Sequence, residues 1–545
     1  MERKEHILIG PEPHSPLESG TIGQYLFNSL KKYGNIPTCI TDPEFGRTIS
    51  YNEMLKLTCH LANGFRRDGY PVGTVISICS ENNLYYLLPV IAAWYVGMIV
   101  APTNPNQTER ELLHVYNITK SEIIFCSEQT LEKIIKLKQK LPFIKKIIIL
   151  NGTVITEEAV TLTNFIQFST AEDLDVTNFQ LEQFDRDNHV AVVLCSSGTT
   201  GFPKCVMLTH RHIMIRLIQS GDSNCNLGLH VKPGGAVLNI LPLFHGYGFW
   251  KTLQFLTMGH HIILMQGFKE QLLLSSIEKY RIGYACFVPT VMAQLVKSEA
   301  LANYDLSSLT ELSVGGSPLS THITCKALER FNIQEVRQGY GLTETTIITA
   351  LTPLRSGKIS SVGKLLSFTK AKVINVDTGE SLGPYKIGEL CIKGETVMKG
   401  YMGDANATEK AIDKSGWFHT GDACYYDEDE YLYIVDRLKE LIKYKSFQVA
   451  PAELEALLVE YPGITEAAVV GKPDLVAGEL PTAFIVTQPD ANITEQEVLT
   501  YIKGIVSKEK QLRGGVYLID TIPKNATGKI VRGKLREFLR KKSKL

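Results

Sequence analysis

One short stretch of the sequence combines hydroxyl side chains, glycines and a lysine within nine residues. It runs Ser196-Ser197-Gly198-Thr199-Thr200-Gly201-Phe202-Pro203-Lys204 and follows an apolar run that is typical of a buried strand. Glycine lets the backbone approach a ligand closely, and hydroxyl and amide groups donate hydrogen bonds to anionic oxygens. We therefore predict a loop that cradles a polyphosphate. Taken alone, the stretch could also be a Ser/Thr-rich surface turn.

Two glycine-bearing segments further along the chain offer more contacts for a nucleotide. Gly315-Gly316-Ser317-Pro318 ends one predicted strand, and a segment from Arg337 to Thr346 follows another. Because ligands bind beyond the carboxyl ends of parallel strands, both segments can converge on one ligand. Tyr340 could stack on a base, Thr343 could donate to a phosphate, and Glu344 could bind Mg²⁺. Taken singly, each segment could also be a glycine-rich turn with a core tyrosine.

In this order, the motifs resemble those of the adenylate-forming superfamily, which includes acyl-CoA synthetases, peptide-synthetase adenylation domains and beetle luciferases. The resemblance runs from about residue 20 to the end of the chain, and residues 438–445, 448–455 and 512–516 look most like beetle luciferases. The chain departs from the family at Cys205, where glycine usually follows Pro-Lys. It also departs at Ser446, which replaces a glycine near the expected path of coenzyme A, where a side chain could hinder that co-substrate.

The resemblance implies binding roles for specific residues. The ATP-binding set is Ser196, Ser197, Gly198, Thr199, Thr200, Gly201 and Lys204 in the first loop, Gly316, Ser317, Gln338, Gly339, Tyr340, Gly341, Leu342 and Thr343 in the glycine-bearing segments, and Asp422 and Arg437 at the ribose. Glu344 would bind Mg²⁺. The acyl pocket would be lined by Arg216, Tyr247, Ile347 and Ile348. Without the resemblance, Asp422 is typical of a turn and Arg437 of a surface cation.

The resemblance also implies three catalytic residues. Lys529 ends Pro523-Lys524-Asn525-Ala526-Thr527-Gly528-Lys529, which resembles the catalytic-lysine motif of the family. A carboxylate that attacks the α-phosphate of ATP needs a cation between the two anions, and Lys529 would supply it. His245 would orient the carboxylate, and Lys443 would act in a second step. The alternatives are a turn lysine for Lys529 and a satisfied core histidine for His245.

The implied reaction has two steps. An acid and Mg-ATP give an acyl-adenylate and pyrophosphate, and rotation of a small domain about residues 436–439 then presents Lys443. In acyl-CoA synthetases coenzyme A takes the acyl group, whereas in luciferases luciferyl-adenylate reacts with oxygen and emits light. Ile347 and Ile348 stand where firefly and click-beetle luciferases carry Ser-Ala, and their bulk narrows the pocket. We expect a ligase for a medium- or long-chain fatty acid. A luciferase is the alternative, and a nucleotide-binding homologue without turnover is a further one.

Strands and helices alternate along most of the chain, and these elements must position the motifs. Ser50 and Glu53 cap a predicted helix that continues past Phe65 and precedes a strand at 75–79. The alternation predicts an α/β fold with mostly parallel sheets sandwiched by helices. After residue 360, short strands and turns predict a β-rich subdomain and then a small α+β unit. We expect an ATP- and acyl-binding domain at 1–436 and a mobile lid domain at 437–545 that carries the catalytic lysine.

Composition restricts the possible functions. The chain has 545 residues, which is more than a single core usually supports. Its 57 basic and 57 acidic side chains give no electrostatic footprint for nucleic acid. Eleven cysteines without paired spacing indicate a reducing compartment rather than a disulfide framework or a zinc site. The apolar stretch from Leu84 to Pro102 contains Pro89 and Gly97 and predicts a buried helix running into a strand, not a transmembrane segment.

Both ends of the sequence bear on localisation. The first six residues are mostly charged and lead into no secretory apolar region. The sequence ends in Ser543-Lys544-Leu545, the tripeptide that the peroxisomal import receptor recognises. The basic residues before it could equally be the solvated end of a last helix. We expect delivery to the peroxisome.

Overall fold

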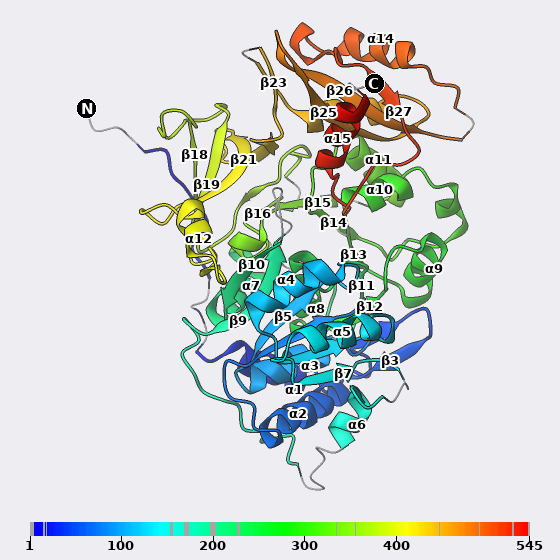
Figure 1. The fold of residues 1–545 in the computed structure, drawn as a ribbon. Helices are drawn as coiled ribbons and strands as arrows, with labels where there is room; N and C mark the ends of the chain where they lie inside the picture. Colours follow the sequence, from blue (N-terminus) through cyan, green and yellow to red (C-terminus); the bar gives the residue numbers. More distant parts are fainter. Residues whose placement is uncertain are drawn as a thin grey trace.

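The chain is described by a computed structural model at residues 5–14, 17, 19–152, 156–167, 174–196, 203–225, 229–333, 335–354, 356–445, 447–489, 491–525 and 528–542. Within these residues the strands form four sheets (Figure 1). Several residues named above lie outside the described residues: Ser197, Gly198, Thr199, Thr200, Gly201, Ser446, Ser543, Lys544 and Leu545.

The first sheet carries the strand that leads into the predicted phosphate loop. Its strands, in spatial order, are β20 (Gly400–Tyr401), β10 (Lys204–Thr209), β9 (Val190–Ser196), β5 (Ile99–Thr103), β4 (Val75–Cys79), β6 (Ile123–Cys126), β7 (Lys146–Ile149) and β8 (Val160–Thr161). The strands from β9 to β8 are parallel, whereas β10 returns antiparallel to β9. The phosphate-loop segment therefore connects two strands of a hairpin, and Cys205 lies within β10, opposite Cys195.

The second sheet carries both glycine-bearing segments. Its strands are β17 (Lys364–Leu365), β16 (Ala350–Leu351), β15 (Glu335–Tyr340), β14 (Glu311–Gly315), β13 (Tyr284–Phe287), β11 (Ala236–Asn239), β12 (His261–Leu264), β2 (Ile40–Asp42) and β3 (Arg47–Ile49). The strands from β15 to β2 are parallel, so β14 and β15 end at the same edge. Arg337 to Tyr340 lie within β15, which corrects the expectation that they follow a strand.

Helices cover these two sheets and fill the space between them. They are α1 (Ile22–Lys32), α2 (Tyr51–Arg67), α3 (Leu87–Tyr95), α4 (Glu109–Thr119), α5 (Glu128–Lys140), α6 (Leu162–Gln167), α7 (His210–Gly221), α8 (Gly246–Thr257), α9 (Glu270–Tyr280), α10 (Pro289–Leu295) and α11 (Thr321–Phe331). One core cluster joins Trp94 of α3 and Phe249 of α8 to Val192 and Val237, which belong to the two different sheets. The mostly parallel, helix-covered α/β architecture predicted from the sequence is confirmed.

The remaining sheets are smaller. The third is antiparallel and contains β1 (Leu8–Ile9), β18 (Thr369–Ile374), β19 (Gly388–Gly394), β21 (Phe418–Tyr426) and β22 (Leu432–Arg437), with α12 (Ala405–Ala411) nearby. The fourth contains β24 (Phe447–Val449), β23 (Ile442–Tyr444), β26 (Gly478–Thr487), β25 (Ile464–Asp474) and β27 (Val516–Leu518), with α13 (Pro451–Glu460), α14 (Glu495–Ile505) and α15 (Arg532–Lys542). In Figure 1 the fourth sheet, orange to red, lies at the end of the molecule near α10 and α11. The predicted division at residue 436 stays a prediction.

Local sequence signals explain where several helices begin. Ser50 and Glu53 form a capping box at the start of α2, as predicted, and Thr494 and Glu497 form another at α14. The stretch from Leu84 to Pro102 contains α3, whose residues are all buried, and most of β5, as predicted. In the described part of the chain, no helix combines the length and apolarity that crossing a bilayer requires.

Candidate active site

A cavity of about 530 Å³ lies where the sequence motifs converge. Its wall is formed by the end of β9, the beginning of β10, the start of α8, the two glycine-bearing segments and the region of Lys529. The predicted site residues that line it are Ser196, Lys204, His245, Tyr247, Gly316, Gly339, Tyr340, Gly341, Leu342, Thr343, Glu344, Ile347, Ile348, Arg437 and Lys529. The fold thus brings segments from most of the chain to one place.

Five other predicted site residues stand apart from the cavity wall. Asp422 lies directly behind it, bonded to Tyr340 and Arg437, which do line the cavity. Ser317 is exposed, and Gln338 is buried on β15, where its Nε2 donates to the Ile359 carbonyl at 2.6 Å. Arg216 is buried behind the wall, and Lys443 is exposed on β23.

Several cationic side chains line the same cavity. Lys204, Arg437, Lys439 and Lys529 all lie on its wall. Burial lowers the pKa of Lys529, and the charge of Arg437 lowers it further. Burial and the charges of Arg437 and Lys204 likewise lower the pKa of Lys439. An anion would relieve this mutual repulsion, so the arrangement suits the triphosphate of a nucleotide.

Asp422 is held in a fixed geometry by two neighbours. Its Oδ2 accepts a hydrogen bond from the Tyr340 hydroxyl at 2.6 Å, and Oδ1 pairs with Arg437 Nε at 2.8 Å. Burial raises the pKa of Asp422, and the Arg437 charge opposes that rise. Because Arg437 and Tyr340 also line the cavity, the three side chains form one rigid group beside it.

Replacing Asp422 with asparagine should weaken ATP binding about 10- to 100-fold, because a charged hydrogen-bond acceptor contributes roughly 1.5–3 kcal/mol. Asparagine keeps the shape of the side chain but loses the charge that holds Arg437. Calorimetric titration with a non-hydrolysable ATP analogue measures the change. Asp429→Asn is the matched control, since Asp429 is exposed on the hairpin turn and pairs with Lys358 at 2.6 Å. Equal affinities for Asp422→Asn and the unaltered protein would contradict the proposed ribose contact.

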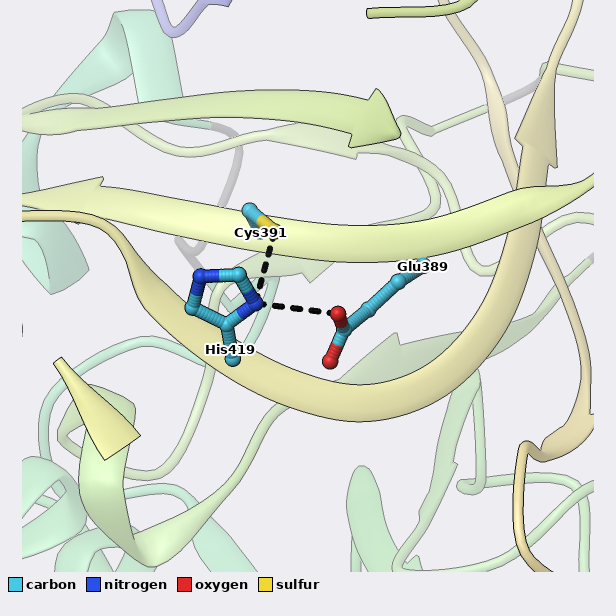
Figure 2. A group of neighbouring side chains, drawn as sticks. All are labelled: Glu389, Cys391 and His419. Atoms are coloured by element: carbon cyan, nitrogen blue, oxygen red, sulfur yellow. Dashed lines mark hydrogen bonds and ion pairs between the residues drawn. The ribbon is translucent and has the colours of Figure 1, made fainter. Parts of the chain in front are cut away.

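Glu389 and Cys391 of β19 and His419 of β21 form a group of neighbouring side chains (Figure 2). His419 Nδ1 lies 3.6 Å from Cys391 Sγ and 2.9 Å from Glu389 Oε2, and these contacts raise the pKa of His419 to about 10. Glu389 Oε1 accepts a hydrogen bond from the backbone N–H of Gly421 at 3.0 Å. The group therefore anchors the turn that presents Asp422.

His245 occupies the N-cap of α8, and its ring points toward the helix backbone. Its Nδ1 accepts the backbone N–H of Tyr247 at 3.4 Å, so the tautomer compatible with this contact carries its proton on Nε2. Burial lowers the pKa of His245 to about 4, and the charge of Lys529 acts in the same direction. At neutral pH His245 is thus a neutral hydrogen-bond donor on the cavity wall, which suits the orientation of a carboxylate.

Arg216 supports the cavity wall from behind. From α7, its Nε donates to the Thr346 carbonyl at 2.8 Å and its Nη2 donates to the Thr345 carbonyl at 3.2 Å. These carbonyls immediately precede Ile347, which lines the cavity with a φ of 80°. A β-branched residue seldom adopts a positive φ. Arg216 therefore fixes the turn that presents Ile347 and Ile348 rather than facing a substrate itself.

The inner part of the cavity contains polar residues that the sequence motifs did not reveal. Trp250 and Lys251 follow Tyr247 on α8, and Tyr284 comes from β13. Tyr247, Trp250 and Lys251 are spaced three and four residues apart and share one helix face. That spacing was a usable signal once Tyr247 had been placed in the pocket. Tyr401, whose hydroxyl donates to Glu344 Oε1 at 3.0 Å, had no signal of its own.

Together, the fold and this cavity define an adenylate-forming enzyme. The family model of the AMP-binding enzymes matches residues 26–402. The family model of the AMP-binding enzyme C-terminal domain matches residues 453–529. The chain belongs to the AMP-binding enzyme family and is luciferase-like. A luciferin 4-monooxygenase of Photuris pensylvanica is 44% identical, over the whole of both chains. A 4-coumarate-CoA ligase of Narcissus pseudonarcissus is 36% identical, over 96% of this chain and 94% of the relative. The structure of a natural red-emitting luciferase from Phrixothrix hirtus has a TM-score of 0.75 at 37% identity, covering 98% of this chain and 99% of that one.

Proposed function

We propose that this adenylate-forming enzyme is an acid–thiol ligase that makes an acyl-adenylate and passes the acyl group to coenzyme A. The observation that carries the first step is Lys529, which lies on the same cavity wall as Thr343, Glu344 and both ends of the phosphate-loop hairpin. Relatives named 4-coumarate-CoA ligase support the thioester step. The expected substrate is a medium- or long-chain fatty acid. The side chains on the inner wall of the cavity restrict this class further.

In the first step a carboxylate oxygen bonds to the α-phosphorus as the bond to pyrophosphate breaks. His245 donates from Nε2 to the carboxylate and holds it in line, and Lys529 stabilises the negative charge that develops between the two anions. The hairpin end at Lys204 and the side chain of Arg437 hold the phosphates and the ribose. The reaction needs no general base, because the carboxylate is already ionised.

The fold family implies Mg²⁺, and the residues present fit that ion. Thr343 and Glu344 offer oxygen atoms on the cavity wall, and the hydrogen bond from Tyr401 fixes the Glu344 carboxylate. Mg²⁺ prefers oxygen ligands and usually takes one or two carboxylates together with substrate phosphates. When bound, the ion would neutralise phosphate charge and make pyrophosphate a better leaving group.

The test is acid-dependent turnover. The protein is incubated with Mg-ATP, coenzyme A and a panel of carboxylic acids, and pyrophosphate and thioester are both quantified. The proposal expects pyrophosphate and thioester in equal amounts for at least one class of acid. Pyrophosphate without thioester would contradict the second step. ATP binding without pyrophosphate for every acid would favour a nucleotide-binding homologue without turnover.

A luciferase is the second candidate, because relatives named luciferin 4-monooxygenase are 40–44% identical to this chain. The bulk of Ile347 and Ile348 argues against binding of luciferin in the acyl pocket. A Cβ atom placed on Gly246 would lie 2.9 Å from a side-chain carbon of Ile347. A Cβ atom placed on Gly339 would lie 3.0 Å from a side-chain carbon of Ile348. Both side chains therefore fill space against the cavity wall.

Replacing Ile347 with serine and Ile348 with alanine should raise light emission from luciferin about tenfold or more, because a few methyl groups in a pocket change discrimination by that order. Serine also tolerates the positive φ at Ile347 better than a β-branched residue does. Luminometry with ATP, luciferin and oxygen measures the effect. Ile347→Val with Ile348→Val keeps the branched bulk and is the control. Unchanged or lower emission from the Ser/Ala variant would argue against this pocket assignment.

Peroxisomal delivery is proposed from Ser543-Lys544-Leu545. The chain, fused at its N-terminus to a fluorescent protein, should colocalise with a peroxisomal marker in cells. Deletion of the three residues should leave it diffuse. The same distribution with and without them would contradict the proposal.

A further inference from the structure

A buried lysine on the inner cavity wall has no part in the reaction described above. Lys251 is 4% exposed, lies on α8 and lines the cavity. Its Nζ donates to the Tyr284 hydroxyl at 2.7 Å and lies 4.8 Å and 4.9 Å from the ring centroids of Trp250 and Tyr284. Among the residues that the structure describes, no carboxylate lies within ion-pair distance of this ammonium.

The carboxylate whose charge acts on Lys251 is already paired with another cation. Glu311 acts on Lys251 through its charge, but its Oε1 pairs with Arg337 Nη1 at 3.0 Å, and both side chains are 2% exposed. The charge of Arg337 in turn disfavours a second cation beside it, and burial lowers the pKa of Lys251 to about 8. Buried charges are normally paired because desolvation is costly. Lys251 therefore lacks the partner that a buried ammonium usually has.

A second buried donor lies beside this ammonium. The indole N–H of Trp250 makes no hydrogen bond, although Trp250 is 1% exposed and lines the cavity. Trp250 Nε1 and the remaining N–H bonds of Lys251 are therefore hydrogen-bond donors without an acceptor. Because buried donors without partners are rare in folded proteins, an acceptor from a ligand is the natural complement.

Helix geometry gives the distance between the two ends of this pocket. His245 caps α8 and Lys251 follows six residues later, so the two lie about 9 Å apart along the helix axis. Tyr247, Trp250 and Lys251 share the face between these ends. A substrate whose reacting carboxylate sits at His245 would therefore place its far end near Lys251.

We propose that Lys251, Tyr284 and Trp250 form a second anion subsite, and that the substrate is a carboxylic acid with an anionic oxygen group at its far end. A carboxylate and a phenolate share this chemistry. The inference rests on the proposed function and replaces the plain fatty acid with a narrower class. The methyl end of an unsubstituted chain would leave the ammonium buried without a counter-ion, whereas a terminal anion would pair with it.

Matched acids test the proposal. Octanoate is compared with octanedioate, and cinnamate is compared with 4-hydroxycinnamate and 4-carboxycinnamate, by the kcat/KM for pyrophosphate release. The unaltered protein should favour the acid with the distal oxygen anion about 10- to 100-fold, the range expected for a charged hydrogen bond. The comparison of 4-hydroxycinnamate with 4-carboxycinnamate shows which distal group is preferred. A preference for octanoate and cinnamate would overturn the proposal.

Variants locate the preference at the subsite. Lys251→Met keeps the length of the side chain and should bring all three kcat/KM ratios close to one, and Tyr284→Phe should reduce them less. Lys279→Met is the control, because Lys279 is exposed on α9. Removing a buried ammonium in this way often leaves stability unchanged, and urea denaturation checks this. Unchanged ratios in Lys251→Met would also overturn the proposal.

A binding measurement separates this inference from the proposed function. Each acid is titrated calorimetrically into the protein saturated with a non-hydrolysable ATP analogue. If no acid is turned over, the proposed function fails, yet tighter binding of octanedioate than octanoate, lost in Lys251→Met, would still support the subsite. If acids are turned over but neither assay shows the preference, the subsite fails alone.

Discussion

Replacing Lys529 with methionine should slow acyl-adenylate formation about 100- to 1,000-fold, the range seen when one donor that stabilises transition-state charge is removed. Lys529 lies on the cavity wall within electrostatic reach of Glu344, Asp422 and Arg437. Its ammonium acts mainly on charge that develops between carboxylate and α-phosphate, so ATP affinity should change only a few-fold. Single-turnover formation of acyl-AMP measures the rate, and calorimetry with an ATP analogue measures the affinity.

The control comes from the same motif. Lys524 Nζ pairs with Glu466 Oε1 at 2.7 Å, within the C-terminal elements, and does not line the cavity. Lys524→Met removes one partly exposed ion pair, which contributes little, and should leave the rate near that of the unaltered protein. Equal rates for Lys529→Met and the unaltered protein would contradict the role of Lys529.

The pH dependence of the first step should also show that the reaction needs the charged form of Lys529. Because burial lowers the pKa of Lys529, its ammonium loses its proton at a lower pH than an exposed lysine does. The charged form is the active one, so the rate should fall as pH rises through this lowered pKa. The alkaline limb should be absent from the residual rate of Lys529→Met.

The sequence predicted the sheets well because their signals are local. Capping boxes such as Ser50 with Glu53, and apolar runs such as Val75–Cys79, specify an element from neighbouring residues alone. The motifs also predicted which loops meet, because the parallel strands β14 and β15 end at one edge of their sheet. The antiparallel return of the chain as β10 was harder to predict, since it depends on the pairing of β10 with β9.

Side-chain direction accounts for most differences at the site. Gln338 lies within β15, where successive side chains point to opposite faces, so it is buried while Gly339 lines the cavity. Arg216 is directed at carbonyls of a turn that is distant in sequence, and no local pattern predicts that contact. Cys391 and His419 meet only because β19 pairs with β21. These positions depend on tertiary register rather than on spacing along the chain.

Replacing Lys443 with alanine should separate the two steps of the reaction. Lys443 is exposed on β23 and does not line the cavity, whereas Lys529 does, so this arrangement of the chain suits adenylation. Because Lys443 and Lys529 both belong to the predicted lid domain, a rotation that brings Lys443 to the cavity would also withdraw Lys529. Thioester formation from isolated acyl-AMP and coenzyme A should fall about 100-fold or more, while formation of acyl-AMP stays within a few-fold.

The readout of this last variant is the fate of acyl-AMP. With ATP, acid and coenzyme A, the Lys443→Ala protein should release pyrophosphate in a burst and accumulate acyl-AMP, because the second step no longer consumes it. Lys503→Ala, which changes an exposed lysine on α14, should behave like the unaltered protein. If Lys443→Ala converted isolated acyl-AMP to thioester at the normal rate, the second step would not use this lysine. Since Lys529 alone would then need to serve both steps, the proposed rotation would lose its physical reason.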